Sequence, residues 1–211
     1  MVRRKKHIDI WNHIPKKEFT ILIGARQIGK STLLKQLFAD LGQKGEIVYF
    51  LNLDRKDILD DLNENPENLF AICPLKEDKK IIVFIDEIQY LNDATSFLKF
   101  LFDEYSDRLK IVATGSSAFY IDKQFNDSLV GRKKIFQMGT LDFEEFLLFK
   151  SREDLVLELN QLRSRKKTKS IQENLLWTYM DEFMNYGGYP AVVLENNIEE
   201  KIEMLKEIRD S

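Results

Sequence analysis

The sequence predicts an α/β fold with a parallel sheet, and three observations support this prediction. Short apolar runs alternate with helix-period stretches through the first two thirds of the chain, a pattern typical of βα units. The apolar runs are continuous rather than alternating, as expected for strands that helices cover on both faces. After residue 138 only helical patterns follow. We therefore expect an α/β core over residues 1–150 and a helical lid over residues 151–211.

The core elements are predicted from these runs. A helix is expected over residues 30–41, because its leucines share one face and Gly42 stands where a C-terminal cap belongs. A second helix is expected over residues 94–105, and Asp142 with Glu145 has the spacing of a capping box at the start of a third. The five predicted strands cover residues 19–23, 47–51, 81–85, 110–113 and 134–138.

The composition excludes several classes of protein. The chain has 211 residues, of which 44% are hydrophobic and 32% charged, so it can form one main core and is not a disordered chain. It has neither an apolar run long enough to span a membrane nor a secretory leader, so we expect a cytoplasmic protein without a membrane partner. One cysteine and two histidines form neither a disulfide nor a metal-ligand set. A net charge of −3 argues against nucleic-acid binding through overall positive charge.

One segment matches a phosphate-binding loop at every fixed position of the pattern G-x-x-x-x-G-K-[ST]. It lies between a predicted strand and a predicted helix, which is the context that gives this pattern its meaning. Gly24 and Gly29 let the backbone turn its N–H groups toward a phosphate, and the helix behind them adds partial positive charge. Lys30 is expected to reach the β- and γ-phosphates, Ser31 to ligate Mg²⁺ and Thr32 to contact phosphate. The expected nucleotide-binding residues of the loop are Gly24, Ala25, Arg26, Gln27, Ile28, Gly29, Lys30, Ser31 and Thr32.

A second motif is an apolar strand that ends in two acidic residues, Asp86 and Glu87. In P-loop enzymes the first carboxylate of such a pair holds the Mg²⁺ shell, and the second can polarise a water molecule. The alternative, a strand that simply ends in solvent, is less favoured because a phosphate loop lies upstream. The predicted strand at residues 47–51 separates the loop from the acidic pair, which resembles the additional-strand ATPases. This resemblance makes Asp86 the expected metal ligand and Glu87 the expected general base.

Two polar residues outside these positions, Ser116 and Arg132, each have a functional and an ordinary interpretation. Ser116 ends the fourth predicted strand, where open α/β sheets bind ligands, so its hydroxyl either senses the γ-phosphate or belongs to a Gly/Ser turn. Arg132 precedes the fifth strand and either stabilises transition-state charge or belongs to a solvated basic loop. Arg26, inside the phosphate loop, is a second candidate for the arginine role.

Six segments of the chain form a series that resembles one family. They are Gly24-Ala25-Arg26-Gln27-Ile28-Gly29-Lys30-Ser31-Thr32, Phe84-Ile85-Asp86-Glu87-Ile88-Gln89, Thr114-Gly115-Ser116-Ser117, Gly131-Arg132, Leu141-Asp142-Phe143-Glu144-Glu145-Phe146 and Tyr186-Gly187-Gly188-Tyr189-Pro190. In this order they resemble the AAA-domain ATPases of bacteria and archaea whose loop reads G-x-R-Q-x-G-K-[ST].

The resemblance implies an AAA+ P-loop core with a five-stranded parallel sheet of order 5-1-4-3-2 and a small helical lid. It also implies ATP and Mg²⁺ as substrate and cofactor, ATP hydrolysis, and a capacity to form homo-oligomers. In that family a further C-terminal region follows the ATPase core, so we expect this chain to be the N-terminal ATPase half. A protein or DNA target would then be reached through that further region.

Four functions are weighed at this point. The leading one is an ATPase whose hydrolysis drives a conformational or assembly change on a target. A nucleotide-switched nucleic-acid-binding module is the alternative, because basic residues cluster at residues 3–6 and 163–169, although charge runs are usually solvated faces. A small-molecule kinase is less favoured, because a kinase must exclude water and Glu87 is placed to activate it. A GTPase is disfavoured because the chain has no guanine-reading Asn-Lys-x-Asp motif.

Overall fold

The structure, a computed structural model, describes residues 2–116, 128–164, 170 and 172–210. The chain divides into two compact units, each of which is described by itself. The α/β unit comprises Lys6–Ala25 and Lys30–Met138, and the helical unit comprises Met1–Lys5, Arg26–Gly29 and Gly139–Ser211.

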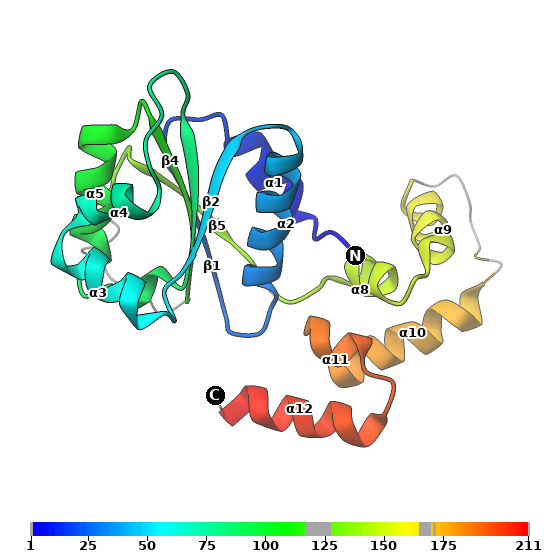
Figure 1. The fold of residues 1–211 in the computed structure, drawn as a ribbon. Helices are drawn as coiled ribbons and strands as arrows, with labels where there is room; N and C mark the ends of the chain where they lie inside the picture. The colour runs from blue at the N-terminus through cyan, green and yellow to red at the C-terminus, as the bar shows by residue number, and fades with distance from the viewer. Residues whose placement is uncertain (1, 117–127, 165–169, 171, 211) are drawn as a thin grey trace. The chain divides into compact units, whose positions relative to one another are not determined.

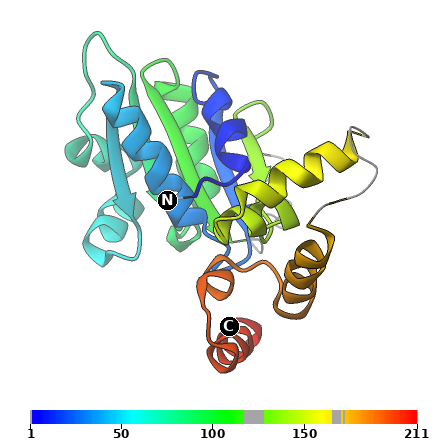
Figure 2. The ribbon, with the colours of Figure 1, turned by 90° about the vertical axis from the view of Figure 1, so that its right-hand side faces the viewer.

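The α/β unit is built on a five-stranded sheet whose strands are all parallel (Figure 1 and Figure 2). The spatial order is β2-β3-β4-β1-β5, which is the predicted order 5-1-4-3-2 read from the other edge. All five predicted strands are therefore confirmed. β1 and β3 are buried along their whole length, as their continuous apolar runs require. The strands are β1 (Phe19–Gly24), β2 (Ile47–Asn52), β3 (Ile81–Asp86), β4 (Leu109–Ser116) and β5 (Lys133–Gln137).

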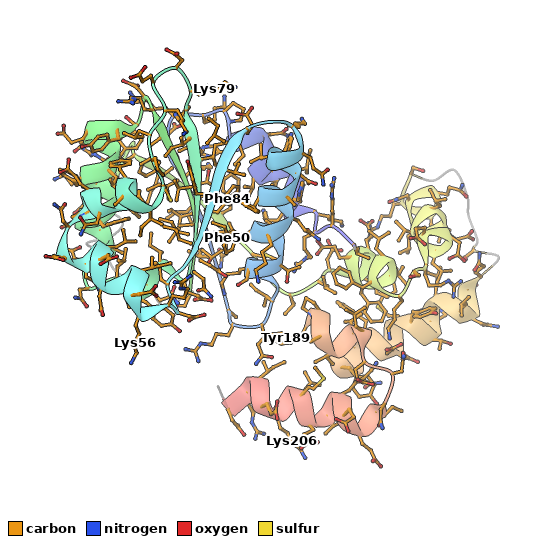
Figure 3. The ribbon with its side chains drawn as sticks, in the orientation of Figure 1. Phe50, Lys56, Lys79, Phe84, Tyr189 and Lys206 are labelled. Carbon is orange, nitrogen blue, oxygen red and sulfur yellow. The ribbon has the colours of Figure 1, made fainter. Side chains whose placement is uncertain are left out.

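Helices cover both faces of this sheet (Figure 1). On one side, the ring of Phe38 in α2 packs edge-on against Phe50 and Phe84, with ring centroids 5.7 and 5.9 Å away (Figure 3). The opposite face carries the larger apolar cluster, which α3 and α5 complete. The helices of this unit are α1 (Lys6–His13), α2 (Lys30–Gln43), α3 (Lys56–Glu64), α4 (Leu69–Ile72) and α5 (Ala94–Tyr105), with the short 3-10 turns η1 (Pro66–Asn68) and η2 (Ile88–Tyr90).

A buried lysine closes the amino-terminal end of the sheet. Lys110, in β4, is 1% exposed, and its Nζ donates hydrogen bonds to the carbonyl oxygens of His13 at 3.2 Å, of Lys16 at 3.0 Å and of Glu18. These carbonyls lie at the end of α1 and in the turn between α1 and β1. Burial, together with the charge of Lys80, lowers the pKa of Lys110 to about 7. The ammonium group thus ties this turn to β4.

His13 makes the stability of this unit depend on pH. Its Nδ1 lies 2.8 Å from Oγ1 of Thr20, and its side chain is 12% exposed. Burial, and then the nearby charge of Lys110, lowers the pKa of His13 to about 4, while Glu18 opposes that shift. In the unfolded chain the pKa is about 6.5, so between pH 6.5 and 4 the unfolded state binds the proton first. Stability therefore falls as pH falls through this window, by roughly 3 kcal/mol from this group.

We expect the His13→Asn variant to show a flatter profile than the wild type. Asparagine keeps a polar partner for Thr20 but does not titrate, so it removes only the histidine contribution. The measurement is the free energy of urea unfolding at pH 7, 6, 5 and 4 for both proteins. Carboxylates elsewhere contribute the same pH dependence to the free energy of unfolding of both proteins. The difference between the two curves of free energy against pH therefore isolates the contribution of His13. Parallel curves would contradict the assignment.

The helical unit contains the remaining helices. α8 begins at the predicted capping box: the Asp142 side chain accepts a hydrogen bond from the Glu145 backbone N–H, and the Glu145 side chain accepts one from that of Asp142. Phe146 and Leu147 of α8 are buried in one cluster with Leu155 and Val193. α8 therefore packs with the later helices, in the compact unit that includes Gly139–Ser211. The helices are α8 (Phe143–Phe149), α9 (Glu153–Arg163), α10 (Glu173–Tyr186), α11 (Pro190–Leu194) and α12 (Ile198–Asp210).

Gly188 lies at a close backbone approach inside this unit. The N–H of Leu141 donates a hydrogen bond to the carbonyl oxygen of Gly188 at 2.7 Å. A Cβ added at Gly188 would lie 2.4 Å from the carbonyl oxygen of Leu141. The Gly-Gly-Tyr-Pro segment thus forms the turn between α10 and α11, with Tyr189 just before α11 (Figure 3), and Gly188 has no room for a side chain. No helix among the described residues is both long and apolar enough to cross a membrane.

Candidate nucleotide-binding site

The phosphate-loop segment connects β1 to α2. Gly24 is the last residue of β1, and Lys30 is the first residue of α2. Between them Gln27 has a φ of 61° and Gly29 a φ of 94°. The left-handed conformation costs glycine little, but a residue with a side chain rarely adopts it. Left-handed turns of this kind expose successive backbone N–H groups as an anion-binding concavity, which agrees with the predicted role of the segment.

Lys30 is held beside the start of the loop. The residue is 6% exposed, and its Nζ donates hydrogen bonds to the carbonyl oxygens of Gly24 at 3.0 Å and Ala25 at 2.7 Å. These two bonds place the ammonium group at the start of the phosphate loop, and an ammonium group is a charged donor suited to phosphate oxygens.

The two predicted metal ligands lie together. Oγ of Ser31 donates a hydrogen bond to Oδ1 of Asp86 at 3.1 Å, and Oγ1 of Thr114 donates to the same oxygen. Asp86 is 4% exposed. The register of β3 and β4 explains the Thr114 contact: Ile85 lies opposite Ala113, so the residues that follow them adjoin. A carboxylate and a hydroxyl are the hard oxygen donors that Mg²⁺ takes in P-loop enzymes, so these residues fit that ion.

Glu87 has an unusual backbone conformation. It adopts φ 61° and ψ 50°, which is the left-handed region, directly before η2. Its N–H donates to Oγ1 of Thr114 at 3.0 Å, and one of its carboxylate oxygens, Oε2, accepts a hydrogen bond from Nε2 of Gln89. Backbone strain of this kind in a non-glycine residue persists where surrounding contacts enforce it, and it is frequent at functional sites.

Ser116 lies beside the start of the phosphate loop. Its partner across the β1–β4 ladder is Gly24, and its N–H donates to Oε1 of Gln89 at 3.2 Å. Ser116 is thus the last residue of β4, next to the phosphate loop, and its predicted role toward the γ-phosphate stays a prediction. Ser117, the next residue of the predicted motif, lies outside the described residues.

Arg132 does not lie at the carboxyl end of the sheet, where β1 ends in Gly24 and β4 in Ser116. It precedes β5, and its carbonyl oxygen accepts a hydrogen bond from the N–H of Phe19, the first residue of β1, at 2.8 Å. Its guanidinium forms a two-pronged ion pair with Asp103 of α5, at 2.6 and 3.1 Å. The length of β1, about 17 Å at the usual rise per residue, separates Phe19 from Gly24. The structure thus places the Arg132 guanidinium beside Asp103 rather than beside the phosphate loop of its own chain, and its role in stabilising transition-state charge stays a prediction.

Arg4 is a buried residue that sequence reasoning missed. In the helical unit its guanidinium donates hydrogen bonds to the carbonyl oxygens of Ile28 at 2.8 Å, Gly139 at 2.9 Å and Thr140 at 3.0 Å, and it pairs with Glu145 at 2.9 Å. Arg4 is 7% exposed and Glu145 4%. The side chain thus anchors the carbonyl of one phosphate-loop residue, Ile28.

The same contacts account for much of the amino-terminal basic cluster. Lys5 pairs with Asp142 at 2.6 Å, and Lys6 pairs with Asp9 at 3.2 Å. With Arg4 bound to Glu145, three cations of this cluster face carboxylates. Of the second basic cluster, residues 165–169 lie outside the described part of the chain.

The chain is similar to several known proteins. The model of a family described as "AAA domain" matches residues 16–147. Two proteins of Methanocaldococcus jannaschii are similar. MJ1544 is 30% identical over 197 residues, which are 93% of this chain and 41% of the relative. MJ1637 is 28% identical over 209 residues, covering 92% of this chain and 43% of the relative. The chain thus spans about two fifths of the length of these relatives.

Solved structures of similar fold include a bacterial one. AMPPCP-bound DnaA from Aquifex aeolicus aligns with a TM-score of 0.52 and 13% sequence identity, over 98% of this chain and 68% of the DnaA chain. At this identity the likeness concerns the fold alone.

Proposed function

The chain belongs to the AAA domain family, and from this premise we propose that it binds ATP with Mg²⁺ and hydrolyses it. The observation that carries the proposal is the hydrogen bond between Ser31 and Asp86. It joins the first turn after the phosphate loop to the acidic end of β3, and these two elements together form a site for a metal-bound triphosphate.

Each residue of the site has a role in this proposal. The backbone of residues 24–32 and the Lys30 ammonium bind the phosphates, and Ser31 with Asp86 holds Mg²⁺. The ion, when bound, neutralises charge on the β- and γ-phosphate oxygens. Glu87 accepts a proton from the water that attacks the γ-phosphorus, while the bond to the ADP oxygen breaks. Ser116 lies beside Gly24 and contacts the γ-phosphate region.

We further propose that hydrolysis drives a conformational or assembly change on a macromolecular target. The family assignment supports this proposal, and the longer relatives provide room for a target-binding region. A nucleotide-switched nucleic-acid module is less well supported, because Arg4, Lys5 and Lys6 are paired with carboxylates.

The test is calorimetric binding and turnover of the wild-type chain with ATP and GTP, each with Mg²⁺ and with EDTA. We expect Mg²⁺-dependent binding of ATP, weaker binding of GTP, and phosphate release from ATP. If Arg132 completes a neighbouring subunit's site, turnover per chain rises with protein concentration, because assembly follows mass action. Absence of ATP binding at millimolar concentration would reject the proposed function.

A further inference from the structure

Gln89 joins the proposed general base to the neighbouring strand. Both polar atoms of its carboxamide form hydrogen bonds. Nε2 donates to Oε2 of Glu87, and Oε1 accepts from the Ser116 N–H at 3.2 Å. The backbone N–H can only donate, so the carboxamide oxygen must face Ser116 and the NH₂ group must face Glu87. The carboxamide thus has one orientation that satisfies both partners.

Glu87 depends on contacts of this kind because of where it stands. It occupies a left-handed position between β3 and η2, so no regular helix or strand geometry sets the direction of its side chain. Its carbonyl oxygen accepts a hydrogen bond from the Tyr90 N–H of η2 at 3.1 Å, and two further contacts of Glu87 lead to β4. Oγ1 of Thr114 holds its backbone N–H, and Gln89, itself bonded to the Ser116 backbone, holds its carboxylate.

We infer that Gln89 is a positioning residue. It orients the Glu87 carboxylate relative to the carboxyl end of β4, to which its own carboxamide is bonded. This inference rests on the proposed function, since it assigns a role to Gln89 only if Glu87 acts on water. The hydrogen bond from Gln89 uses Oε2 of Glu87. In this inference the other carboxylate oxygen, Oε1, accepts the proton from water. Because Ser116 also neighbours Gly24 across the ladder, Gln89 fixes the base relative to the strand pair that begins the phosphate loop.

The test uses Gln89→Met, a variant of nearly the same length that cannot hydrogen bond in this way. A hydrogen bond to a charged group contributes enough for kcat to fall roughly 10- to 100-fold when it is lost. The dissociation constant for Mg-ATP should stay within about twofold, because Gln89 does not touch the phosphates or the metal in this assignment. Gln43→Ala, at the exposed end of α2, is the matched control and should retain wild-type kcat. Gln89→Glu places a second carboxylate beside Glu87 and should lower kcat at least as much.

A double-mutant cycle separates positioning from general damage. In the Glu87→Gln background, Gln89→Met should cause no further loss of the residual turnover, because its effect passes through Glu87. An equal fold-loss in both backgrounds, a loss of ATP affinity that parallels kcat, or a kcat at or above the wild-type value would overturn the inference. Absence of ATP turnover in the wild type would instead reject the proposed function itself, so the two failures are distinguishable.

Discussion

The Lys30→Ala variant is expected to lose detectable Mg-ATP binding. Lys30 is buried at the start of α2, and its Nζ is held by the carbonyl oxygens of Gly24 and Ala25. A triphosphate in this loop would therefore meet a cation whose side chain is already ordered, so little conformational entropy remains to be lost on binding. Each charge-assisted hydrogen bond to phosphate contributes about 1.5–3 kcal/mol. Losing two of them weakens binding by roughly 100-fold or more.

Isothermal titration of both proteins with Mg-ATP checks this expectation. The matched control is Lys35→Ala, which removes the same charge from the exposed side of the same helix. It separates the local role of Lys30 from the net charge of the chain and should bind ATP as the wild type does. A circular dichroism melt confirms that Lys30→Ala is folded, since the substitution also removes two hydrogen bonds of the loop. Equal affinities of Lys30→Ala and the wild type would contradict the nucleotide site.

Much of the α/β unit is predictable because its strands are continuous apolar runs. β3 has five apolar residues between Lys80 and Asp86, and a short apolar run with charged residues at both ends is typical of a buried strand. α5 has the predicted bounds, because Asp93 caps it through the Ser96 N–H and its apolar spacing is helical. The order of the strands depended on the family resemblance, since an apolar run does not specify which strand lies beside it.

The elements that were not predicted have weak sequence signals. α3 begins after Arg55, which makes no side-chain cap hydrogen bond, and it buries only Ile58 and Leu62. Two buried residues in a short polar stretch do not distinguish a helix from a loop. α1 likewise buries only His7 and Ile10.

Within the site, the residues that motifs define were predictable and their partners were not. The two motifs identify Ser31 and Asp86, and in the structure Oγ of Ser31 lies 3.1 Å from Oδ1 of Asp86. The roles of Thr114 and Gln89 depend on the register between β3 and β4 and on the left-handed turn at Glu87. Neither is encoded in the local sequence, because both result from packing between segments far apart in the chain.

The Glu87→Gln variant is expected to bind ATP and to lose hydrolysis. Glutamine has nearly the same shape as glutamate but cannot accept the proton from water, and general-base catalysis typically contributes two to four orders of magnitude in rate. We therefore expect kcat to fall by roughly 100- to 10,000-fold, with little change in ATP affinity. Affinity is preserved because the phosphate and metal roles belong to Lys30, Ser31 and Asp86, and none of these residues is altered.

The measurement combines single-turnover phosphate release with calorimetric binding of Mg-ATP, so that chemistry and affinity are read separately. Glu64→Gln is the matched control, because it makes the same substitution at an exposed position at the end of α3, and its kcat should equal that of the wild type. If Glu87→Gln loses ATP affinity but keeps its turnover per bound nucleotide, then Glu87 is a metal or phosphate ligand rather than the base. In that case the strained backbone at Glu87 serves to complete the binding site, and water must be activated by another group.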